Sequence, residues 1–333
     1  MSEFLYLTRQ EREARERELL SPAAACSADS RGRARDETGD PIRTAFERDR
    51  DRIYYSKAFR RLKHKTQVFL NPEGDHFVTR LTHTLQVTQV GRSLAAALGL
   101  NEALTEAICL GHEVGHPPFG HTGEVALSPY FEDEWLHSEQ SVRVFEILEP
   151  INLSWEVLDG IRAHTWKVDP GPATAEGMIC RYADRIAYLV HDMHDAMRAG
   201  ILQRSDIPAA AIQAFGEPGG EWIGSMIHAV VDGSLAAGEL TMDPGMLAAM
   251  HSFRDFMFEN VYLRPEANKQ ANKAVKLIRD LVEHFLEHPD ELPSTYRHRE
   301  SSERVQVIDF VAGMSDRYAL RVHDSLFRPS GQV

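Results

Sequence analysis

Apolar residues recur at helical spacing along most of this chain of 333 residues. In the stretch 80–94 the inward stripe consists of Val87, Val90 and Leu94, and it continues one turn further at Leu98. Residues three or four apart lie on the same side of a helix, so this spacing predicts a helix with one buried face.

Similar patterns predict more helices and no sheet. Leu104 and Ile108 mark a second helix, residues 135–149 a shorter one, and the segment from Glu176 to Arg198 a long one. The stripe of this long helix is formed by Ile179, Ala183, Ile186, Ala187 and Val190. Past Gly200 the pattern is helical again, and no alternation of period two is long enough for a central strand. We therefore expect an all-α fold.

The first 40 residues differ from the rest. They contain a mixed-charge run, E-R-E-A-R-E-R-E, followed by polar sequence with glycine. Such a run forms an exposed helix through pairs of opposite charge. We expect residues 1–40 to be a peripheral arm on one large domain, 41–333, which has a core at about 60–200 and a C-terminal helical part at about 201–333.

Composition limits the protein classes. The net charge of −13 argues against nonspecific coating of nucleic acid, which needs a broad basic surface. Apolar runs such as 94–98 are far too short to span a membrane, and no signal peptide is evident. We expect a cytoplasmic protein without a membrane partner. The cysteines Cys26, Cys109 and Cys180 are odd in number and far apart, so histidine and carboxylate must provide any metal ligands.

The most informative stretch runs from residue 109 to 124 and reads C-L-G-H-E-V-G-H-P-P-F-G-H-T-G-E. It contains three imidazoles and two carboxylates, His112, His116, His121, Glu113 and Glu124. These are ligand types that zinc, manganese and iron prefer. A solvated loop is the alternative, but the path is restricted by Gly115, Pro117, Pro118 and Gly120. His121 and Glu124 are three residues apart, so we expect them within hydrogen-bond distance.

A basic segment, residues 43–65, precedes this stretch. It carries nine lysines and arginines, among them Arg60 and Lys65, against three acidic residues, a net charge of +6. The segment is either a solvated helix face or a binding wall for a compact polyanion such as a triphosphate, because arginine pairs bidentately with phosphate oxygens.

The predicted helices carry further polar candidates. His83 continues the inward stripe of its helix, where a lone histidine is more often a core residue, and Arg80 lies one turn away. Asp184, Tyr188 and Asp192 fall at i, i+4 and i+8 on one face of the long helix. An exposed helix could carry the same residues without any function. If His83 and His112 both face inward, Asp184 becomes a natural further ligand.

Taken together, these residues resemble the H…HD…D signature of HD-domain phosphohydrolases. Within that superfamily the chain is similar to deoxynucleoside triphosphate triphosphohydrolases of the dGTPase-like branch. The matching stretches are S-R-G-R at 30–33, R-D-R-I and S-K-A-F-R-R-L-K-H-K-T-Q-V within 50–68, the stretch 109–124, Y-A-D-R-I-A-Y-L-V-H-D at 182–192 and S-D-R-Y-A-L from 315. The likeness covers about residues 27–325.

The resemblance implies roles for individual residues. A divalent ion (Mn²⁺, Mg²⁺, Co²⁺, Zn²⁺ or Fe²⁺) would be held by His83, His112, Glu113 and Asp184. His121 and Glu124 would be the catalytic pair. The substrate would meet Arg60, Lys65, Gln67, Arg80, His116, His137, Tyr188 and Asp192. Of these, Gln67 and Asp192 would face the deoxyribose, and Lys65, Arg80, His137 and Tyr188 the phosphates.

The same resemblance implies an activity and partners. Metal-bound water would attack the α-phosphate of a dNTP, dGTP among them, and release a deoxynucleoside and tripolyphosphate. Relatives are commonly homo-oligomers, hexamers or tetramers, with nucleotide activators, and single-stranded nucleic acid is a further expected partner.

One position departs from the family pattern, because Glu113 stands where the signature has aspartate. Its extra methylene adds about 1.5 Å of reach. Two other functions therefore stay open. One is a regulatory protein that senses dNTPs or binds single-stranded nucleic acid with impaired catalysis. The other is an HD-type nucleotidase or phosphodiesterase.

Overall fold

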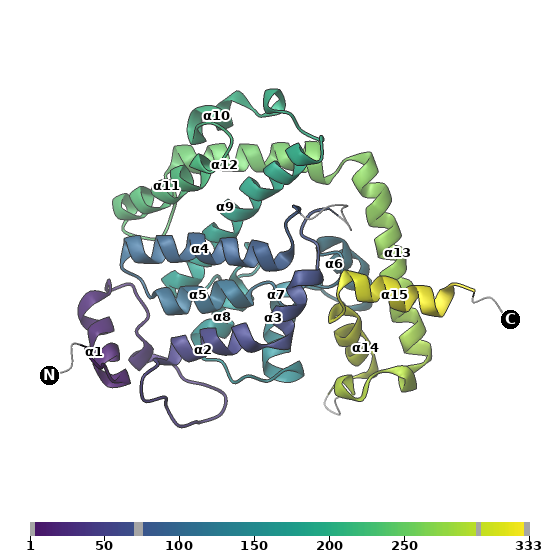
Figure 1. Cartoon of the computed structure of the whole chain (residues 1–333), viewed down its shortest axis with the longest axis horizontal. Coiled ribbons are helices and arrows are strands. Elements are labelled where there is room, and N and C mark those ends of the chain that lie inside the picture. Colours follow the sequence, from purple (N-terminus) through teal and green to yellow (C-terminus); the bar gives the residue numbers. More distant parts are fainter. Residues whose placement is uncertain (1–3, 70–75, 298–300, 330–333) are drawn as a thin grey trace.

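A computed structural model of the protein describes residues 4–69, 76–297 and 301–329 (Figure 1). Within these residues it contains no β-strand, only two isolated bridges. The α-helices are α1 (Arg9–Leu19), α2 (Ala45–Tyr55), α3 (Lys57–Arg61), α4 (Arg80–Leu98), α5 (Glu102–Gly111), α6 (His121–Leu127), α7 (His137–Arg143), α8 (Trp155–Ala163), α9 (Ala175–Arg198), α10 (Ala209–Phe215), α11 (Glu221–Ala237), α12 (Pro244–Met257), α13 (Pro265–Glu287), α14 (Glu303–Ala312) and α15 (Asp316–Phe327). The predicted all-α fold is confirmed.

Polar caps begin the central helices. The side chain of Thr79 accepts a hydrogen bond from the backbone of the first turn of α4, and Asn101 does the same for α5. These bonds satisfy amide groups that have no partner within the helix. Gly99 ends α4 in the left-handed conformation, with φ of 65°. The caps place His83 in the first turn of α4 and His112 directly after the last turn of α5.

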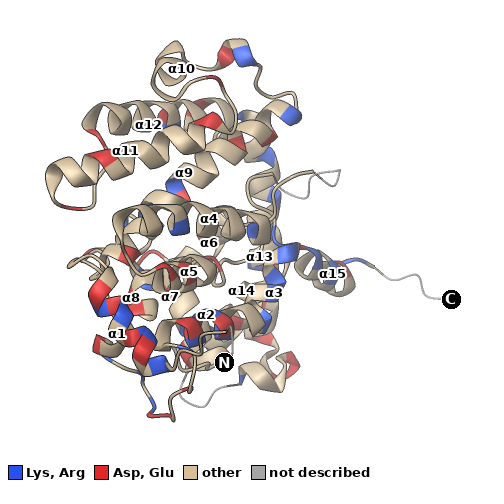
Figure 2. Ribbon diagram, turned by 60° about the vertical axis from the view of Figure 1, so that its left-hand side comes forward, with Lys and Arg blue, Asp and Glu red and all other residues tan. Residues whose placement is uncertain are grey.

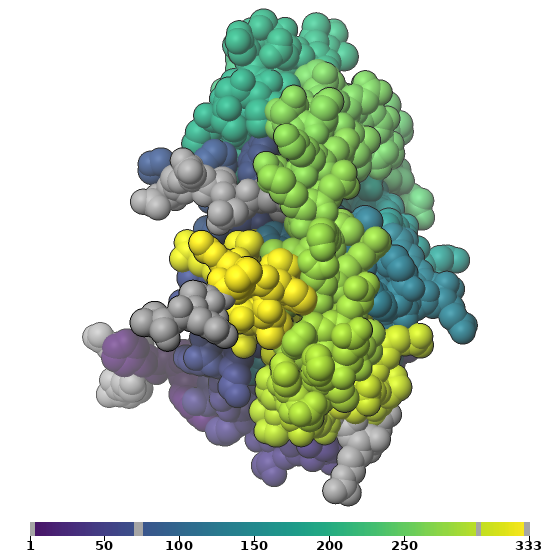
Figure 3. Space-filling model, turned by 90° about the vertical axis from the view of Figure 1, so that its right-hand side faces the viewer, coloured from purple at the N-terminus to yellow at the C-terminus, as the bar shows by residue number. Residues whose placement is uncertain are grey.

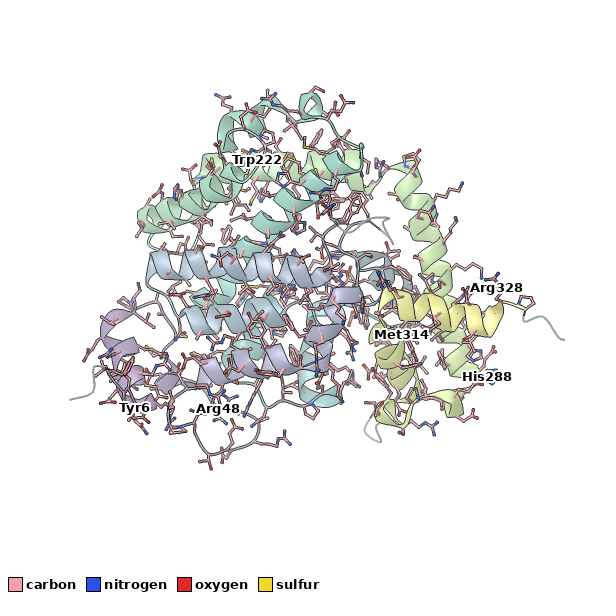
Figure 4. The ribbon with its side chains drawn as sticks, viewed as in Figure 1. Tyr6, Arg48, Trp222, His288, Met314 and Arg328 are labelled. Carbon is pink, nitrogen blue, oxygen red and sulfur yellow. The ribbon has the colours of Figure 1, made fainter. Side chains whose placement is uncertain are left out.

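The main core forms where α4 packs against α5 and α9, and where α2 packs against α5. Figure 1 shows α4, α5 and α2 stacked in one direction, with α9 crossing them at an angle. Val87 and Leu94 of α4 and Ile186 of α9 are fully buried in this core. The inward stripes expected from the sequence therefore meet one another. Above them, Trp222 is buried between Phe215 and Phe253 in the layer of α10, α11 and α12 (Figure 4).

A second core holds the C-terminal helices together. Ile278 and Leu281 of α13 and Val311 of α14 are fully buried there, together with Leu127 of α6. Helix α13 packs against α6 as well as α14 and α15. It runs down the face shown in Figure 3, with α15 beside it. Through α6, this second core lies directly behind the stretch 109–124.

The N-terminal helix α1 has no buried residue, as expected for an arm. Several contacts fasten the segment to the body. Arg12 pairs with Glu47, and the hydroxyl of Ser21 donates to the carbonyl of Leu98. Tyr6 lies exposed at this end of the molecule (Figure 4). The arm boundary at residue 40 and the division near residue 200 stay predictions, and residues 1–3 lie outside the described part.

None of the described helices is both long enough and apolar enough to pass through a lipid bilayer.

Candidate active site

Three helices bring three predicted metal ligands together. His83 comes from the start of α4, His112 from the end of α5 and Asp184 from the middle of α9. An oxygen of Asp184, Oδ1, lies 3.2 Å from Nε2 of His83 and 3.9 Å from Nε2 of His112. One ligand atom from each residue lies within 4.8 Å of the other two. The grouping has the size of a metal site.

The hydrogen bonds of both imidazoles turn Nε2 toward this grouping. Nδ1 of His112 donates to the carbonyl oxygen of Cys109 at 2.6 Å, so Nε2 of the neutral ring carries the free lone pair. Nδ1 of His83 lies 2.8 Å from Nε2 of His191. The Nε2 atoms of His83 and His112 are buried, and neither has a hydrogen-bond partner in the part of the chain that the structure describes. Two buried lone pairs beside a carboxylate fit a divalent metal ion.

Charge supports the same conclusion. Burial lowers the pKa of His112, which keeps the ring neutral and able to bind a metal. Burial alone would raise the pKa of Asp184, but the neighbouring His83 and His112 outweigh it and hold this pKa below its ordinary value. A neutral imidazole and an ionised carboxylate therefore face one another, with His83 beside them.

The two carboxylate oxygens of Glu113 have different neighbours. One oxygen accepts a hydrogen bond from the guanidinium of Arg80. The other, Oε1, lies 3.6 Å from Nε2 of His112, 3.8 Å from Nε2 of His83 and 3.4 Å from Nε2 of His116. Burial would raise the pKa of Glu113, but Arg80 and His116 hold it well below its usual range. The longer side chain thus lies between the metal grouping and a second histidine cluster.

This second cluster consists of His116, His121 and His137. The rings of His116 and His137 are stacked with centroids 3.7 Å apart. His116 is fully buried, and neither ring nitrogen has a hydrogen-bond partner among residues 4–69, 76–297 and 301–329. The side chain of His121, in contrast, is 75% exposed. A buried imidazole without partners beside an exposed one is a candidate contact for a polar ligand.

The structure corrects the expected hydrogen bond between His121 and Glu124. Their closest atoms are 3.7 Å apart, which is too long for a hydrogen bond. Glu124 instead accepts two bonds from His137, 2.9 Å from the backbone amide and 2.7 Å from Nδ1. The reason is geometric: α7 begins at His137 and presents both donors to one carboxylate oxygen.

A further residue completes this network. Nε2 of His137 lies 3.0 Å from Nε2 of His164, whose Nδ1 bonds to the carbonyl of Ile161. A carbonyl can only accept, so Nδ1 of His164 carries its proton and Nε2 is an acceptor. His137 then donates from both nitrogens and is an imidazolium. Burial would lower the pKa of His137, but Glu124 raises it above its ordinary value.

Two families match parts of the chain, the HD domain over residues 80–189 and the phosphohydrolase-associated domain over residues 240–325. A crystal structure of a hypothetical protein from Aquifex aeolicus aligns over 84% of this chain and 68% of that chain, with a TM-score of 0.48 and 21% identity. A likeness this distant bears on neither the site nor the activity.

Whole-length relatives are much closer. A deoxyguanosinetriphosphate triphosphohydrolase-like protein of Caldanaerobacter subterraneus is 46% identical over 95% of this chain and 94% of its own length. Proteins of the same name from Desulfatibacillum aliphaticivorans and Clostridium perfringens are 43% and 41% identical, over 98% and 94% of this chain and 99% and 96% of theirs. The chain belongs to the deoxyguanosinetriphosphate triphosphohydrolase-like family. The predicted family is thereby confirmed.

In this triphosphohydrolase-like chain, the other predicted substrate contacts differ in their surroundings. Arg80 is fully buried beside Glu113, and its guanidinium lies 3.5 Å from the backbone oxygen of Gln67. Oε1 of Gln67 is buried without a hydrogen-bond partner in the described chain. Lys65 is 1% exposed, and its amine donates to the carbonyls of His116 and Ala312. Arg80 and Gln67 therefore lie side by side next to Glu113, whereas the Lys65 amine is bonded to backbone carbonyls.

Two predicted contacts lie along α9 beyond Asp184. Oδ2 of Asp192 accepts a 2.7 Å hydrogen bond from the hydroxyl of Tyr262. Burial raises the pKa of Tyr188 to about 12, so its hydroxyl stays protonated and can donate. Both residues follow the face of α9 that carries Asp184, at the spacing of one helical turn.

For much of the segment 43–65 the ion pairs favour a solvated helix face, one of the two alternatives, over a binding wall. Arg43, Arg48, Arg50 and Arg52 form ion pairs with carboxylates of residues 37–51 and 106. Figure 2 shows the alternation of both charges along α1 and α2. Arg60 is exposed, and its guanidinium bonds to the carbonyls of Tyr55 and Ser56. Part of the segment's positive charge is thus offset by carboxylates outside it, at Glu37, Asp40 and Glu106.

Sequence reasoning missed His164 and underrated His191. His164 falls at the spacing of Val157 and Ile161, both fully buried on α8, so the helical pattern alone could have placed it inward. His191 lies one turn beyond the core residue Ala187 on α9. No metal-ligand motif in the sequence pointed to either residue.

Proposed function

We propose that this protein hydrolyses dNTPs, dGTP among them, to a deoxynucleoside and tripolyphosphate in a metal-dependent reaction. One observation carries the proposal: the buried Nε2 atoms of His83 and His112 lack hydrogen-bond partners in the described chain and face the Asp184 carboxylate beside a second histidine cluster. The family membership supports a metal-dependent phosphohydrolase.

His83, His112 and Asp184 would hold the ion, with Oε1 of Glu113 as a further oxygen near it. When bound, a divalent ion lowers the pKa of water and polarises phosphate oxygens. The family's usual aspartate and this glutamate are both anionic oxygen ligands. The choice among Mn²⁺, Mg²⁺, Co²⁺, Zn²⁺ and Fe²⁺ stays a prediction.

The second cluster would act on the phosphates. The His137 imidazolium and the Arg80 guanidinium would neutralise charge on a bound triphosphate. His121 has an exposed ring and would exchange a proton with the departing 5′-oxygen. Glu124 would act through His137, by holding that ring charged and in place.

Gln67, Tyr188 and Asp192 would recognise the deoxyribose end of the substrate and the adjoining phosphates. The Oε1 atom of Gln67 is buried and has no hydrogen-bond partner within the described residues, so it is free to accept from a sugar hydroxyl. The protonated Tyr188 hydroxyl supplies a donor near Asp184. Closely packed side chains of this kind would leave no space for a 2′-hydroxyl.

A product screen tests the proposal. All four dNTPs are incubated with Mn²⁺, Mg²⁺ or Co²⁺, and products are read by phosphorus NMR. We expect tripolyphosphate and a deoxynucleoside in equal amounts. Orthophosphate or a nucleoside monophosphate would instead identify a nucleotidase or phosphodiesterase of the same scaffold. Running the screen with pairs of dNTPs also reports whether one nucleotide activates hydrolysis of another.

An alternative is a dNTP-sensing protein with impaired catalysis, and the bond between Glu113 and Arg80 is the observation that favours it. Replacing Glu113 by aspartate shortens the side chain by about 1.5 Å. Because a displacement of about 1 Å can change a rate roughly 100-fold, we expect Glu113→Asp to alter turnover within that range. The measurement is tripolyphosphate release at equal metal occupancy. If the native chain released no tripolyphosphate and the Glu113→Asp variant did, the native protein would be a dNTP sensor.

We propose four further properties. A nucleotide activator would find unpaired cations in a surface hollow of about 590 Å³ lined by Arg61, His64, Arg317, Arg321, Tyr296 and Tyr318. None of these three arginines has a carboxylate within ion-pair distance among the described residues. A homo-oligomer, hexamer or tetramer, a cytoplasmic location, and binding of single-stranded nucleic acid stay predictions.

A further inference from the structure

The motif S-D-R-Y near the C-terminus has no part in the proposed chemistry, yet its aspartate is buried. Asp316 is the first residue of α15 and is 3% exposed. It lies just after Met314, at the junction of α14 and α15 (Figure 4). The helix cap is supplied by Ser315, whose side chain accepts from the backbone amide of Tyr318. The carboxylate of Asp316 is therefore free for contacts outside its own helix.

Those contacts reach two loops beside the candidate active site. Oδ1 of Asp316 accepts a 2.9 Å hydrogen bond from the backbone amide of Phe119. Oδ2 accepts from the backbone amide of Thr66 at 2.9 Å and from its hydroxyl at 2.6 Å. Phe119 lies two residues before His121, and Thr66 lies one residue before Gln67. One carboxylate thus joins the loop before Gln67 to the turn before His121.

The turn before His121 needs an anchor. Phe119 has φ of 64° and Gly120 has φ of 58°. A residue with a side chain seldom adopts positive φ unless surrounding contacts hold it there. The Phe119 ring is 6% exposed in the C-terminal core, and its amide is held by Asp316. Side chain and backbone of the strained residue are therefore both fixed by the C-terminal helices.

The same turn sets the position of Arg80. A Cβ atom at Gly120 would lie 2.0 Å from Nη2 of Arg80, so the turn closes directly on the guanidinium. The amine of Lys65 donates to the carbonyl of His116 and to that of Ala312, which ties the start of the turn to the end of α14. The segment 116–121 is thus held at both ends by residues 312–316.

We propose that Asp316 is a positioning residue for the reaction: by fixing the Phe119–Gly120 turn, it places His121 and Arg80 for the chemical step. This inference rests on the proposed function. It makes turnover depend on how the C-terminal helices sit against the turn, while the metal grouping on α4, α5 and α9 is independent of it.

The central test is Asp316→Asn. An amide cannot accept with both of its arms, so the asparagine must lose the bond from the backbone amide of Phe119 or the one from the backbone amide of Thr66. Asp316→Glu is made alongside, because it keeps the charge but moves the carboxylate by about 1.5 Å. For both variants we expect kcat per folded chain to fall roughly 10- to 100-fold with little change in KM. Mn²⁺ affinity is expected to match that of the native chain.

A matched control separates positioning from stability. Asp280→Asn makes the same chemical change within the C-terminal helices, where Asp280 accepts from His323 of α15 and from Lys276. This control should retain kcat within about twofold of the native value.

Hydrogen exchange gives a readout that does not need activity. In Asp316→Asn, amides of residues 116–124 should exchange on the order of tenfold faster, while those of α4 stay unchanged. If Asp280→Asn loses as much kcat, or if exchange in 116–124 stays at the native level, the positioning role is refuted. If the native chain releases no tripolyphosphate, the proposed function fails, and the exchange measurement still decides whether Asp316 anchors the turn.

Discussion

Asp184→Asn is expected to abolish both tight Mn²⁺ binding and turnover. Asp184 provides the carboxylate nearest to Nε2 of His83, with Oδ1 3.2 Å away, and the same oxygen lies 3.9 Å from Nε2 of His112. An amide of the same size keeps the shape but removes the negative charge that offsets the ion. Loss of a residue that merely orients a ligand costs roughly 10- to 100-fold in metal affinity, and loss of a ligand should exceed that.

Equilibrium dialysis followed by elemental analysis measures the bound metal, and tripolyphosphate release measures turnover. Asp195→Asn is the matched control. Asp195 lies on the same helix, is 3% exposed, and accepts a hydrogen bond from the amide of Val78 instead of facing the histidines. An Asp184→Asn protein that binds Mn²⁺ as tightly as the native chain would show that the ion lies elsewhere.

His121→Ala should lower tripolyphosphate release roughly 100- to 10,000-fold, the usual contribution of a general acid or base. Because the His121 side chain is 75% exposed and lies 3.7 Å from its nearest carboxylate oxygen, its removal should leave the fold and the metal grouping intact. Binding of a non-hydrolysable dNTP analogue should stay near the native level, since Arg80, His116 and His137 remain. The loss would then appear in kcat and only weakly in KM.

The control for this prediction is His228→Ala, an exposed histidine on α11 outside the site. It should leave turnover unchanged. Equal turnover in His121→Ala and native protein would exclude His121 from proton transfer. The second cluster would then act only as a binding surface for phosphates.

The partners of Glu124 and of Asp316 belong to other secondary-structure elements, which is why the sequence did not predict them. Glu124 lies three residues from His121, yet it bonds to His137, because α6 and α7 are brought together by packing. Asp316 lies nearly 200 residues from Phe119 in the sequence and is in direct contact with it. Local spacing reports which residues share a helix face, and it contains no information about the element that covers that face.

The sequence by itself determined the all-α class and the family, and it placed His83 on the inward stripe of its helix, because burial on a helix repeats with a short, regular period. Only the tertiary structure decided which charges pair and which stay open. Folding neutralised Arg48 and Arg52 with Glu37, joined His137 to His164, and set Asp316 against the turn before His121. Side-chain partners depend on distances between helices, and those distances exist only once both cores have packed.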